Sequence, residues 1–422
     1  MTAGIGSWAA GTFRSLRVRN YRLFAAGQIV SNTGTWMQRI AQDWLVLSLT
    51  NSSTAVGITT ALQFLPMLLF GLWGGVLADR YPKRRTLIAT QSTMGLLAAA
   101  LAVLTLTGTV RVGYVYLIAL LLGFATVVDN PTRQSFVTEM VGEADLRNAV
   151  SLNSAIFQSA RLVGPAVAGV LINAVGPGWA FGLNAVSFGG VLTGLLLMRP
   201  RELFPAPTVS RAKGQLRDGL RYIASRKELI WPIVLVGFVG TFGYNWPIVL
   251  SAFAKNVFHH GAGTYGVFNT LMAVGSLAGA LLAARRATSR LRLLVGAAAG
   301  FGALEVLAAL TPWYYVFGPL LLVLGLVGLT FNTTANATVQ LAAAPEMRGR
   351  VMGVYMLVFT GGTPIGGPLV GWVTEHYGAR VGLAFGGTVA ALAAAVIAGI
   401  LYLSRRYRSV GLVRERIAGH RA

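Results

Sequence analysis

The sequence has no cysteine and few charged residues of either sign. Of its 422 residues none is a cysteine, which excludes disulfides and thiolate chemistry. Only 11% are Asp, Glu, Lys or Arg, whereas soluble domains carry about 25%. Its four histidines are too scattered to suggest a metal site: His259, His260, His376 and His420. We therefore expect neither a bound metal nor a cofactor.

Motifs for catalysis are also missing from the sequence. No G-x-x-x-x-G-K-[ST] loop is present to hold the phosphates of ATP, and no credible Ser/His/Asp set occurs. We expect no enzyme and no catalytic residues. The N-terminus, "MTAGIGSWAAGTFRSLRVRNYR", does not predict a cleaved signal peptide, because its apolar core is short and its cations follow its apolar residues.

What the sequence does have is apolar residues, at 55%, with a mean hydropathy of +0.63. A soluble protein of this composition would expose large apolar patches, so lipid is the expected solvent. A helix needs about 20 apolar residues to cross a bilayer. Twelve such stretches are predicted as transmembrane helices of an all-α membrane protein: 21–49, 56–77, 87–107, 112–137, 148–174, 179–198, 229–254, 264–284, 292–311, 313–341, 349–374 and 379–403.

Cations are distributed unequally between the two sides of these twelve stretches. With both termini in the cytoplasm, outer loops receive only Arg111, Lys255 and Arg380, and three more arginines fall within spans. All the other lysines and arginines lie on the cytoplasmic side, as the positive-inside rule requires. This asymmetry accounts for the net charge of +22, so we expect no nucleic-acid partner.

The two halves of the chain repeat each other. "GPAVAG" at 164 is matched by "GPLVG" at 367, and Glu143 and Arg147 are matched 203 residues later by Glu346 and Arg350. Parallel repeats of this kind are typical of secondary transporters built of two halves. We expect two six-helix bundles, at 1–198 and 229–403, and a basic cytoplasmic tail at 404–422. Between the bundles we expect a central cytoplasmic loop, 199–228, with a short amphipathic helix. This helix either lies on the inner leaflet or is simply a solvated linker.

The loop after the second stretch, "GGVLADRYPKRR", joins close-packing glycines to one acid and a group of cations. It resembles the loop signature of the major facilitator superfamily, G-x-L-A-D-R-x-x-[KR]-[KR]-[KR], with Pro82 where the family usually has glycine. The resemblance implies a cytoplasmic gate in which Asp79 lies against the positive N-terminus of the eleventh span. Read from the residues alone, the acid is a helix-end charge and the cations only set topology. The gating residues implied are Gly75, Asp79, Arg80, Lys83, Arg84 and Arg85.

Two longer segments, 20–57 and 129–169, are similar to the drug and siderophore exporters related to enterobactin and macrolide efflux proteins, a drug:proton antiporter branch. Gly164, Pro165 and Gly169 resemble the G-P-x-x-G-G signature of proton antiporters, although Ala168 stands at one glycine position. Pro165 removes a backbone donor and bends the helix. The alternative is an ordinary kink in a membrane helix.

Charged side chains inside the predicted spans are candidates for proton coupling, because ionisable groups in lipid are costly and usually functional. Arg39 and Asp43 are four residues apart on one helix, as are Asp129 and Arg133, and Arg161 lies near the middle of the fifth span. Asp43 and Asp129 are the predicted coupling acids, with the three arginines as partners. Alternatively, these are structural ion pairs.

Polar and aromatic residues on the less apolar spans predict a cavity for a bulky amphipathic solute. Its predicted lining residues are Gln28, Asn32, Gln38, Asn153, Gln158, Tyr244, Asn245, Trp246, Asn332 and Asn336. We expect a monomeric multi-pass protein of the cell membrane that exports drugs or siderophores in exchange for protons, by alternating access. The alternative is a proton-coupled importer of a nutrient or organic anion on the same fold.

Overall fold

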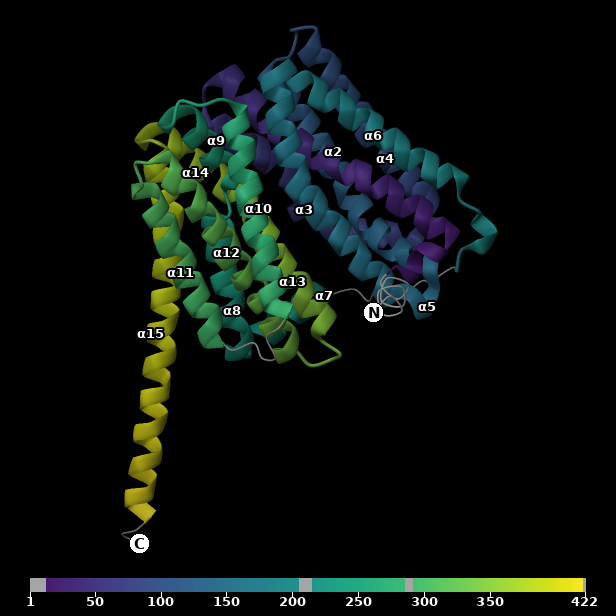
Figure 1. Ribbon diagram of the computed structural model, residues 1–422. Helices are drawn as coiled ribbons and strands as arrows, with labels where there is room; N and C mark the ends of the chain where they lie inside the picture. Colours follow the sequence, from purple (N-terminus) through teal and green to yellow (C-terminus); the bar gives the residue numbers. More distant parts are fainter. Residues whose placement is uncertain (1–12, 205–214, 285–290, 420–422) are drawn as a thin grey trace, which may run out of the picture.

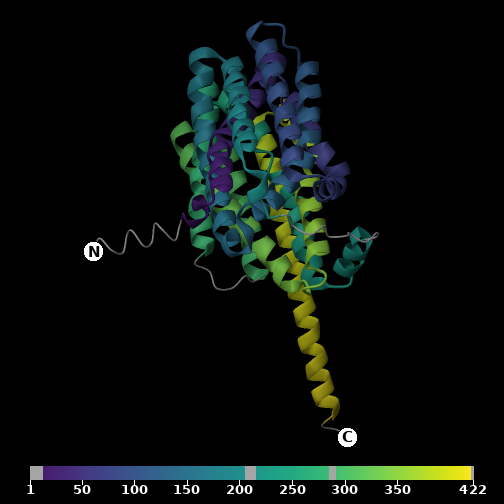
Figure 2. The same ribbon diagram turned by 90° about the vertical axis from the view of Figure 1, so that its right-hand side faces the viewer.

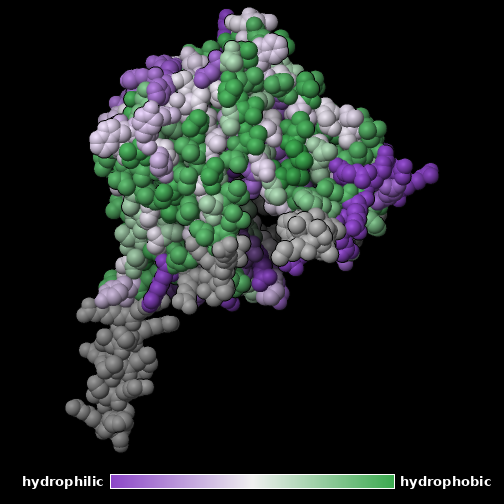
Figure 3. Space-filling model, in the orientation of Figure 1, coloured by the Kyte–Doolittle hydropathy of each residue, from purple (hydrophilic) through white to green (hydrophobic). Residues whose placement is uncertain are grey.

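The computed structural model describes residues 13–204, 215–284 and 291–419, and within these ranges the chain is helical with no strand. Figure 1 shows the helices in two groups, one formed by the first half of the chain and the other by the second. Among the described residues, ten helices or runs of helices are long and apolar enough to cross a membrane. Apolar residues cover most of the face in Figure 3.

The first group, called here the N group, contains five helices after a short 3₁₀ turn at Arg14–Arg17. They are α2 (Arg19–Thr50), α3 (Ser53–Arg80), α4 (Lys83–Leu106), α5 (Val112–Val175) and α6 (Pro177–Leu197). These helices cover the first six predicted stretches, with ends that differ by a few residues.

The helix α5 is one continuous element of 64 residues only by its hydrogen bonds. As a straight helix it would be about 96 Å long, roughly three times the thickness of a bilayer core. Gly142 interrupts it with φ 68° and ψ −177°. This conformation is open essentially to glycine alone, so Gly142 turns the chain and divides α5 into a first and a second part.

The helix α2 is not among the ten apolar helices, and its side chains explain why. It buries polar residues inside the protein, including Gln28, Gln38, Gln42 and Asp43. Such a helix faces other helices and a polar cavity rather than lipid. The polar side chains of α2 are therefore explained by its packing against other helices, mainly α5 and α6.

The second group, called here the C group, contains the helices from α8 to α15. They are α8 (Lys227–Phe238), α9 (Trp246–Ala252), α10 (Ala262–Ala284), α11 (Leu291–Leu310), α12 (Tyr314–Ala342), α13 (Arg348–Gly361), α14 (Thr363–Tyr377) and α15 (Ala379–Gly419), with π-helical turns at Val239–Gly243 and Phe253–Val257. Figure 2 shows α15 running on well beyond the rest of the bundle.

Two predicted stretches of the C group, 229–254 and 349–374, are interrupted helices, and their interruptions meet. A Cβ at Gly366 would collide with the carbonyl oxygen of Thr241, and a Cβ at Gly362 with the Thr241 hydroxyl. The absence of side chains at these glycines lets the π-helical turn pack directly on the α13–α14 junction. Sequence hydropathy predicted a single unbroken helix at each place, because each interruption is short and is flanked by apolar residues on both sides.

The central segment contains the expected short helix, α7 (Gln215–Ala224), which contacts α13 and α8. Arg350 donates a hydrogen bond to Asp218 at 3.2 Å, and the Tyr222 hydroxyl accepts one from the backbone N–H of Ala344 at 3.1 Å. Ile223 is buried, whereas Leu220 is 50% exposed. One side of α7 therefore packs on the C group, and its other side exposes Leu220.

The N and C groups touch at one end of the molecule, which we call the closed end. There Glu375 of α14 accepts hydrogen bonds from the Ser52 hydroxyl at 2.5 Å and the Thr54 N–H at 2.9 Å. Gly57 of α3 packs on Gly367 of α14. At the opposite end, called the open end, the groups diverge, and α15 extends beyond the bundle on that side (Figure 1).

Candidate functional site

A cavity of about 890 Å³ lies along the inner face of the N group. Figure 3 shows a hollow between the two groups at the lower centre. The amide side chains that line the cavity are Gln28, Asn32, Gln38, Gln42, Gln63, Gln91, Asn130, Gln134, Asn153, Gln158 and Asn184. Its aromatic lining residues are Phe24, Trp36, Phe157 and Phe188.

The charged groups of this wall have one sign. Arg39 and Arg133 line the cavity, and none of the described residues that line it is acidic. Amides and hydroxyls both donate and accept hydrogen bonds, and arginine only donates. The wall is therefore suited to oxygen-bearing groups, and its aromatic rings offer flat apolar surfaces.

The structure brings together half of the residues predicted to line a cavity. Gln28, Asn32, Gln38, Asn153 and Gln158 line it. The remaining five belong to the C group and lie outside the lining of this cavity. Their contacts there are within the C group: the Tyr244 hydroxyl donates to Gly328, Asn245 donates to Thr241 and Phe242, Trp246 packs on Phe301, Asn332 accepts from Tyr355, and Asn336 accepts from Gln340.

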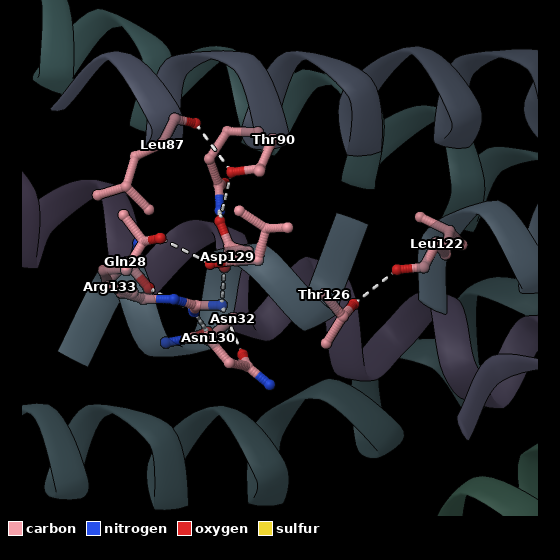
Figure 4. Close-up of polar contacts among 12 residues, drawn as sticks. Gln28, Asn32, Leu87, Thr90, Leu122, Thr126, Asp129, Asn130 and Arg133 are labelled. Atoms are coloured by element: carbon pink, nitrogen blue, oxygen red, sulfur yellow. Dashed lines mark hydrogen bonds and ion pairs between the residues drawn. The ribbon is translucent and has the colours of Figure 1, made fainter. Parts of the chain in front are cut away.

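Asp129 forms the ion pair with Arg133 that their spacing predicts (Figure 4). The carboxylate is completely buried, and it also accepts hydrogen bonds from Thr90 at 2.8 Å and Gln91 at 2.7 Å. Arg133 reaches on to Gln28 of α2 at 3.0 Å. The network joins three helices, α2, α4 and α5, and satisfies a charge that would otherwise be costly to bury.

Asp43 has a different environment from the one predicted. Its carboxylate accepts a hydrogen bond from the Tyr265 hydroxyl of α10 at 2.9 Å, and it is 7% exposed. No ion pair joins it to Arg39 in the described parts of the chain, although the two lie four residues apart. The hydrogen bond crosses from the N group to the C group near the closed end, so Asp43 belongs to the contact between the two groups.

Arg39 and Arg161 meet at the ring of Trp36. Their guanidinium carbons lie 4.9 and 5.8 Å from the ring centroid, within the range of cation–π attraction. Phe157 packs against the same indole in a T-shaped arrangement, with 5.8 Å between the ring centroids. Trp36, Arg39 and Phe157 line the cavity, and Arg161 adjoins this corner through its contact with Trp36.

The corner depends on Gly164 of the sequence signature. A Cβ there would come within 2.5 Å of the Trp36 Cβ, so only glycine lets the second part of α5 approach α2 so closely. Further along the same helix, Gly169 packs on Gly263 and Gly266 of α10, and the Pro165 carbonyl also faces Gly266. The signature therefore contacts both groups of helices, on the cavity side and at the closed end.

The predicted gating loop is tied to its own group. Lys83 pairs with Glu139 of α5 at 2.6 Å, and Arg84 donates to the carbonyl oxygens of Leu195 and Leu196, at the end of α6. A cation at a helix C-terminus satisfies carbonyls that have no partner within the helix. Gly75 is buried, Asp79 is half-buried, and Arg80 and Arg85 are exposed.

Glu305 of α11 is a buried acid that sequence reasoning located within a span but did not select. It is 1% exposed, and its Oε2 has no hydrogen-bond partner in the described chain. Phe301, one helical turn away, stacks on Tyr244 at 5.2 Å between centroids. The sequence signal was a single glutamate in an otherwise apolar stretch, but no partner at helical spacing drew attention to it.

Comparison with known proteins places the chain among membrane transporters. The model of the family described as "Transmembrane secretion effector" matches residues 10–412. The Staphyloferrin A transporter of Staphylococcus aureus is 25% identical over 62% of this chain and 66% of its own length. The Enterobactin exporter EntS of Citrobacter koseri is 25% identical over 83% and 84%, and the Multidrug efflux pump Tap of Mycolicibacterium fortuitum is 28% identical over 84% and 89%.

Solved structures share the fold at low sequence identity. A bacterial homologue of the human lysosomal transporter Spinster, in an inward-facing and unoccupied conformation, superposes with a TM-score of 0.71 at 14% identity, over 90% of this chain and 96% of its own. A mutant of the nucleoside transporter NupG gives a TM-score of 0.74 at 11% identity, over 90% and 99%.

Proposed function

Because the chain belongs to the transmembrane secretion effector family of the major facilitator superfamily, we propose that it is a secondary active exporter of amphipathic small molecules such as siderophores or drugs. It is a multi-pass transporter of the bacterial cell membrane and not an enzyme. The observation that carries the proposal is the cavity of about 890 Å³, whose polar and aromatic walls are formed by the N group, in a protein whose two groups meet at the closed end. Its volume is typical of sites for small molecules, roughly 300–1,000 Å³.

The outward direction is supported by the names of the relatives, two of which are an exporter and an efflux pump. The proposed mechanism is alternating access, in which the two groups rock about the cavity. The protein described here is open at one end and closed at the other, which is one of the two states that this mechanism needs. A single chain contains the whole cavity, so the proposed unit is a monomer.

The proposed topology has twelve crossings in two bundles of six, 1–198 and 229–403. The two parts of α5 on either side of Gly142 count as two crossings, and the polar helix α2 adds one to the apolar ten. The cationic loop at 80–85 lies at the open end, so the positive-inside rule assigns this end to the cytoplasm. An exporter loads from this side, which agrees with a cavity that opens there.

The cytoplasmic gate is proposed to close when the open end comes together. Asp79 and Arg80 end α3 on that side, and α13, which contacts α3, begins at Arg348. An acid facing the N-terminus of α13 would be stabilised by the unpaired N–H groups there. Lys83 and Arg84, already bound within the N group, hold the loop in place for this contact.

Proton exchange is proposed to drive export. The contacts of the buried acids indicate which of them is the best candidate to carry the proton. Asp129 is held by an ion pair and two hydrogen bonds, which supports a structural role. Asp43 has one hydrogen bond, to Tyr265, at a contact that breaks when the closed end opens. Opening would expose Asp43 to outside water, so we favour Asp43 over Asp129. Glu305 is a third candidate.

The test is export by inside-out membrane vesicles that carry a pH gradient. A siderophore or an efflux-pump drug should dissipate the gradient as it accumulates in the vesicles. If a nutrient instead moves in the opposite direction together with protons, the importer alternative replaces this proposal. Vesicles without the protein are the control for passive leakage.

The proton carrier is tested by Asp43→Asn and Asp129→Asn in the same vesicles. Asp43→Asn should still bind substrate but should abolish substrate-driven proton movement. Asp129→Asn should lower the amount of folded protein, and the protein that folds should still exchange protons. If both variants exchange protons at the original rate, neither acid carries the proton.

A further inference from the structure

Two arginines beside the cavity lack an ion-pair partner. Arg39 and Arg161 each lie over Trp36, and in the described chain neither is within ion-pair distance of a carboxylate. The Nε atom of Arg39 is buried without a hydrogen-bond partner. Arg133, in the same wall, differs because its charge is matched by Asp129.

The groups that face these two arginines do not neutralise them. Asp43 acts on Arg39 electrostatically but is hydrogen-bonded to Tyr265 across the interface. The group that faces Arg161 from the C group is Tyr244, a neutral phenol whose hydroxyl donates to Gly328. The two guanidinium groups also act on each other. Like charges so close together inside a membrane protein are costly unless an anion joins them.

The rest of the wall is suited to an anion and unsuited to a cation. Gln38, Gln42 and Gln158 also line the cavity, and their amide N–H₂ groups can donate hydrogen bonds to oxygen. No acidic residue is present among the described lining residues, although a bound organic cation would need a negative partner. Phe157, 47% exposed, presents an apolar ring beside Trp36.

We propose that the cavity binds organic anions, with an oxyanion held between Arg39 and Arg161 and a flat apolar part against Trp36 and Phe157. Guanidinium groups bind oxyanions by charge-assisted hydrogen bonds in a planar fork. The inference rests on the proposed function, because the anion is the exported substrate. It narrows the amphipathic small molecules to those with a negative, oxygen-bearing group.

The test compares two xanthene dyes of similar size and opposite charge, carboxyfluorescein and rhodamine 123. Their binding to the purified full-length protein is measured by fluorescence anisotropy. The anionic dye should bind at least about tenfold more tightly than the cationic one. Arg39→Gln and Arg161→Gln should each weaken binding of the anionic dye about tenfold or more, as expected for the loss of a charge-assisted hydrogen bond. Neither variant should weaken binding of the cationic dye.

The matched control is Arg111→Gln, which removes the same charge from an exposed position outside the cavity. This variant should bind both dyes as the unaltered protein does. Arg161→Lys keeps the charge without the fork and should recover part of the binding lost in Arg161→Gln. The proposal is overturned if the anionic dye does not bind, if rhodamine 123 binds more tightly, or if Arg39→Gln and Arg111→Gln behave alike.

Binding and transport separate this inference from the proposed function. If carboxyfluorescein binds through both arginines but no compound moves in the vesicles, the substrate class stands and the exporter proposal fails. If cationic dyes are exported, and Arg39→Gln and Arg161→Gln leave their export intact, the exporter proposal stands and the anion site fails.

Discussion

In the N group, polar side chains inside the protein bind one another, whereas the interior of the C group contains clustered aromatic rings and one buried acid, Glu305. Asp129, Arg133, Thr90 and Gln91 form a closed network in the wall of the cavity. In the C group, Phe253, Phe258, Phe268, Tyr314 and Phe317 stack closely, with Phe253 and Phe317 only 4.6 Å apart.

This difference indicates a division of labour between two halves that repeat each other in sequence. The N group presents hydrogen-bonding groups to a solute and holds them with further polar contacts, which preorganises the site. The C group has the interrupted helices α8–α9 and α13–α14, whose junctions meet at Thr241 and Gly366. Unwound backbone of this kind is tolerated in a membrane protein where neighbouring helices cover it, and it is where transporter helices bend.

The largest effect is expected from breaking the polar network of the N group. Arg133→Leu leaves the carboxylate of Asp129 buried with only neutral donors, so the free energy of unfolding should fall by about 3–5 kcal/mol. Arg14→Leu breaks the pair of Arg14 with Asp145, in which the Arg14 side chain is 57% exposed, and should cost less than about 1 kcal/mol. Thermal unfolding of both variants in detergent measures the difference. Equal losses would show that the network contributes no more than a surface pair.

The next effect concerns the closed end, where both groups use glycine. At Gly57 a Cβ would collide with the carbonyl oxygen of Gly367, so Gly57→Leu should keep α3 and α14 apart. Gly296→Leu is the matched control, because a Cβ at Gly296 meets nothing within 4 Å. We expect export to fall more than about tenfold in Gly57→Leu only, since overpacking costs roughly 1–3 kcal/mol.

The conformation behind that loss can be measured directly because the sequence contains no cysteine. A single Phe157→Cys places a thiol in the cavity, where an impermeant maleimide reaches it from the open end. In combination with Gly57→Leu, the thiol should also react from the opposite side of the membrane. Labelling from the open end alone in both backgrounds would show that the closed end tolerates the leucine.

Sequence patterns predicted some of these features and not others, for physical reasons. The apolar stretches and the pair at Asp129 and Arg133 follow from helical spacing, which is a local property. The corner at Trp36 could not be predicted, because it needs α2 to meet α5 at Gly164, which is far from Trp36 in the chain. The five C-group residues expected in the cavity were chosen because they are polar or aromatic, but neither property distinguishes a cavity wall from a contact inside the helix bundle.

A smaller effect is expected from the acid that spans the closed end. Glu375→Gln replaces charge-assisted hydrogen bonds to Ser52 and Thr54 with neutral ones, at an exposed position. We expect the conformation with the closed end shut to lose about 0.5–1 kcal/mol of stability relative to the conformation with this end open. This corresponds to roughly a two- to fivefold change in the ratio of the two conformations. The labelling rate of Phe157→Cys from the closed side measures this shift. Glu346→Gln, at an exposed glutamate of the open end, should leave the rate unchanged.

The smallest effect on stability is expected at the isolated acid of the C group. Glu305→Gln removes no ion pair found in the described chain and leaves the side-chain volume unchanged, so unfolding should shift by less than about 1 kcal/mol. Asp129→Asn is the comparison in the N group, because it leaves Arg133 without its counter-charge.

A stable Glu305→Gln variant that no longer exchanges protons would assign the proton carrier to the C group and the solute site to the N group. A stable variant that exchanges normally would leave Asp43 as the carrier, so that proton and solute sites both lie on α2. A large loss of stability would instead mean that Glu305 holds the aromatic packing together, and the contrast between the two groups would then be one of side-chain type alone.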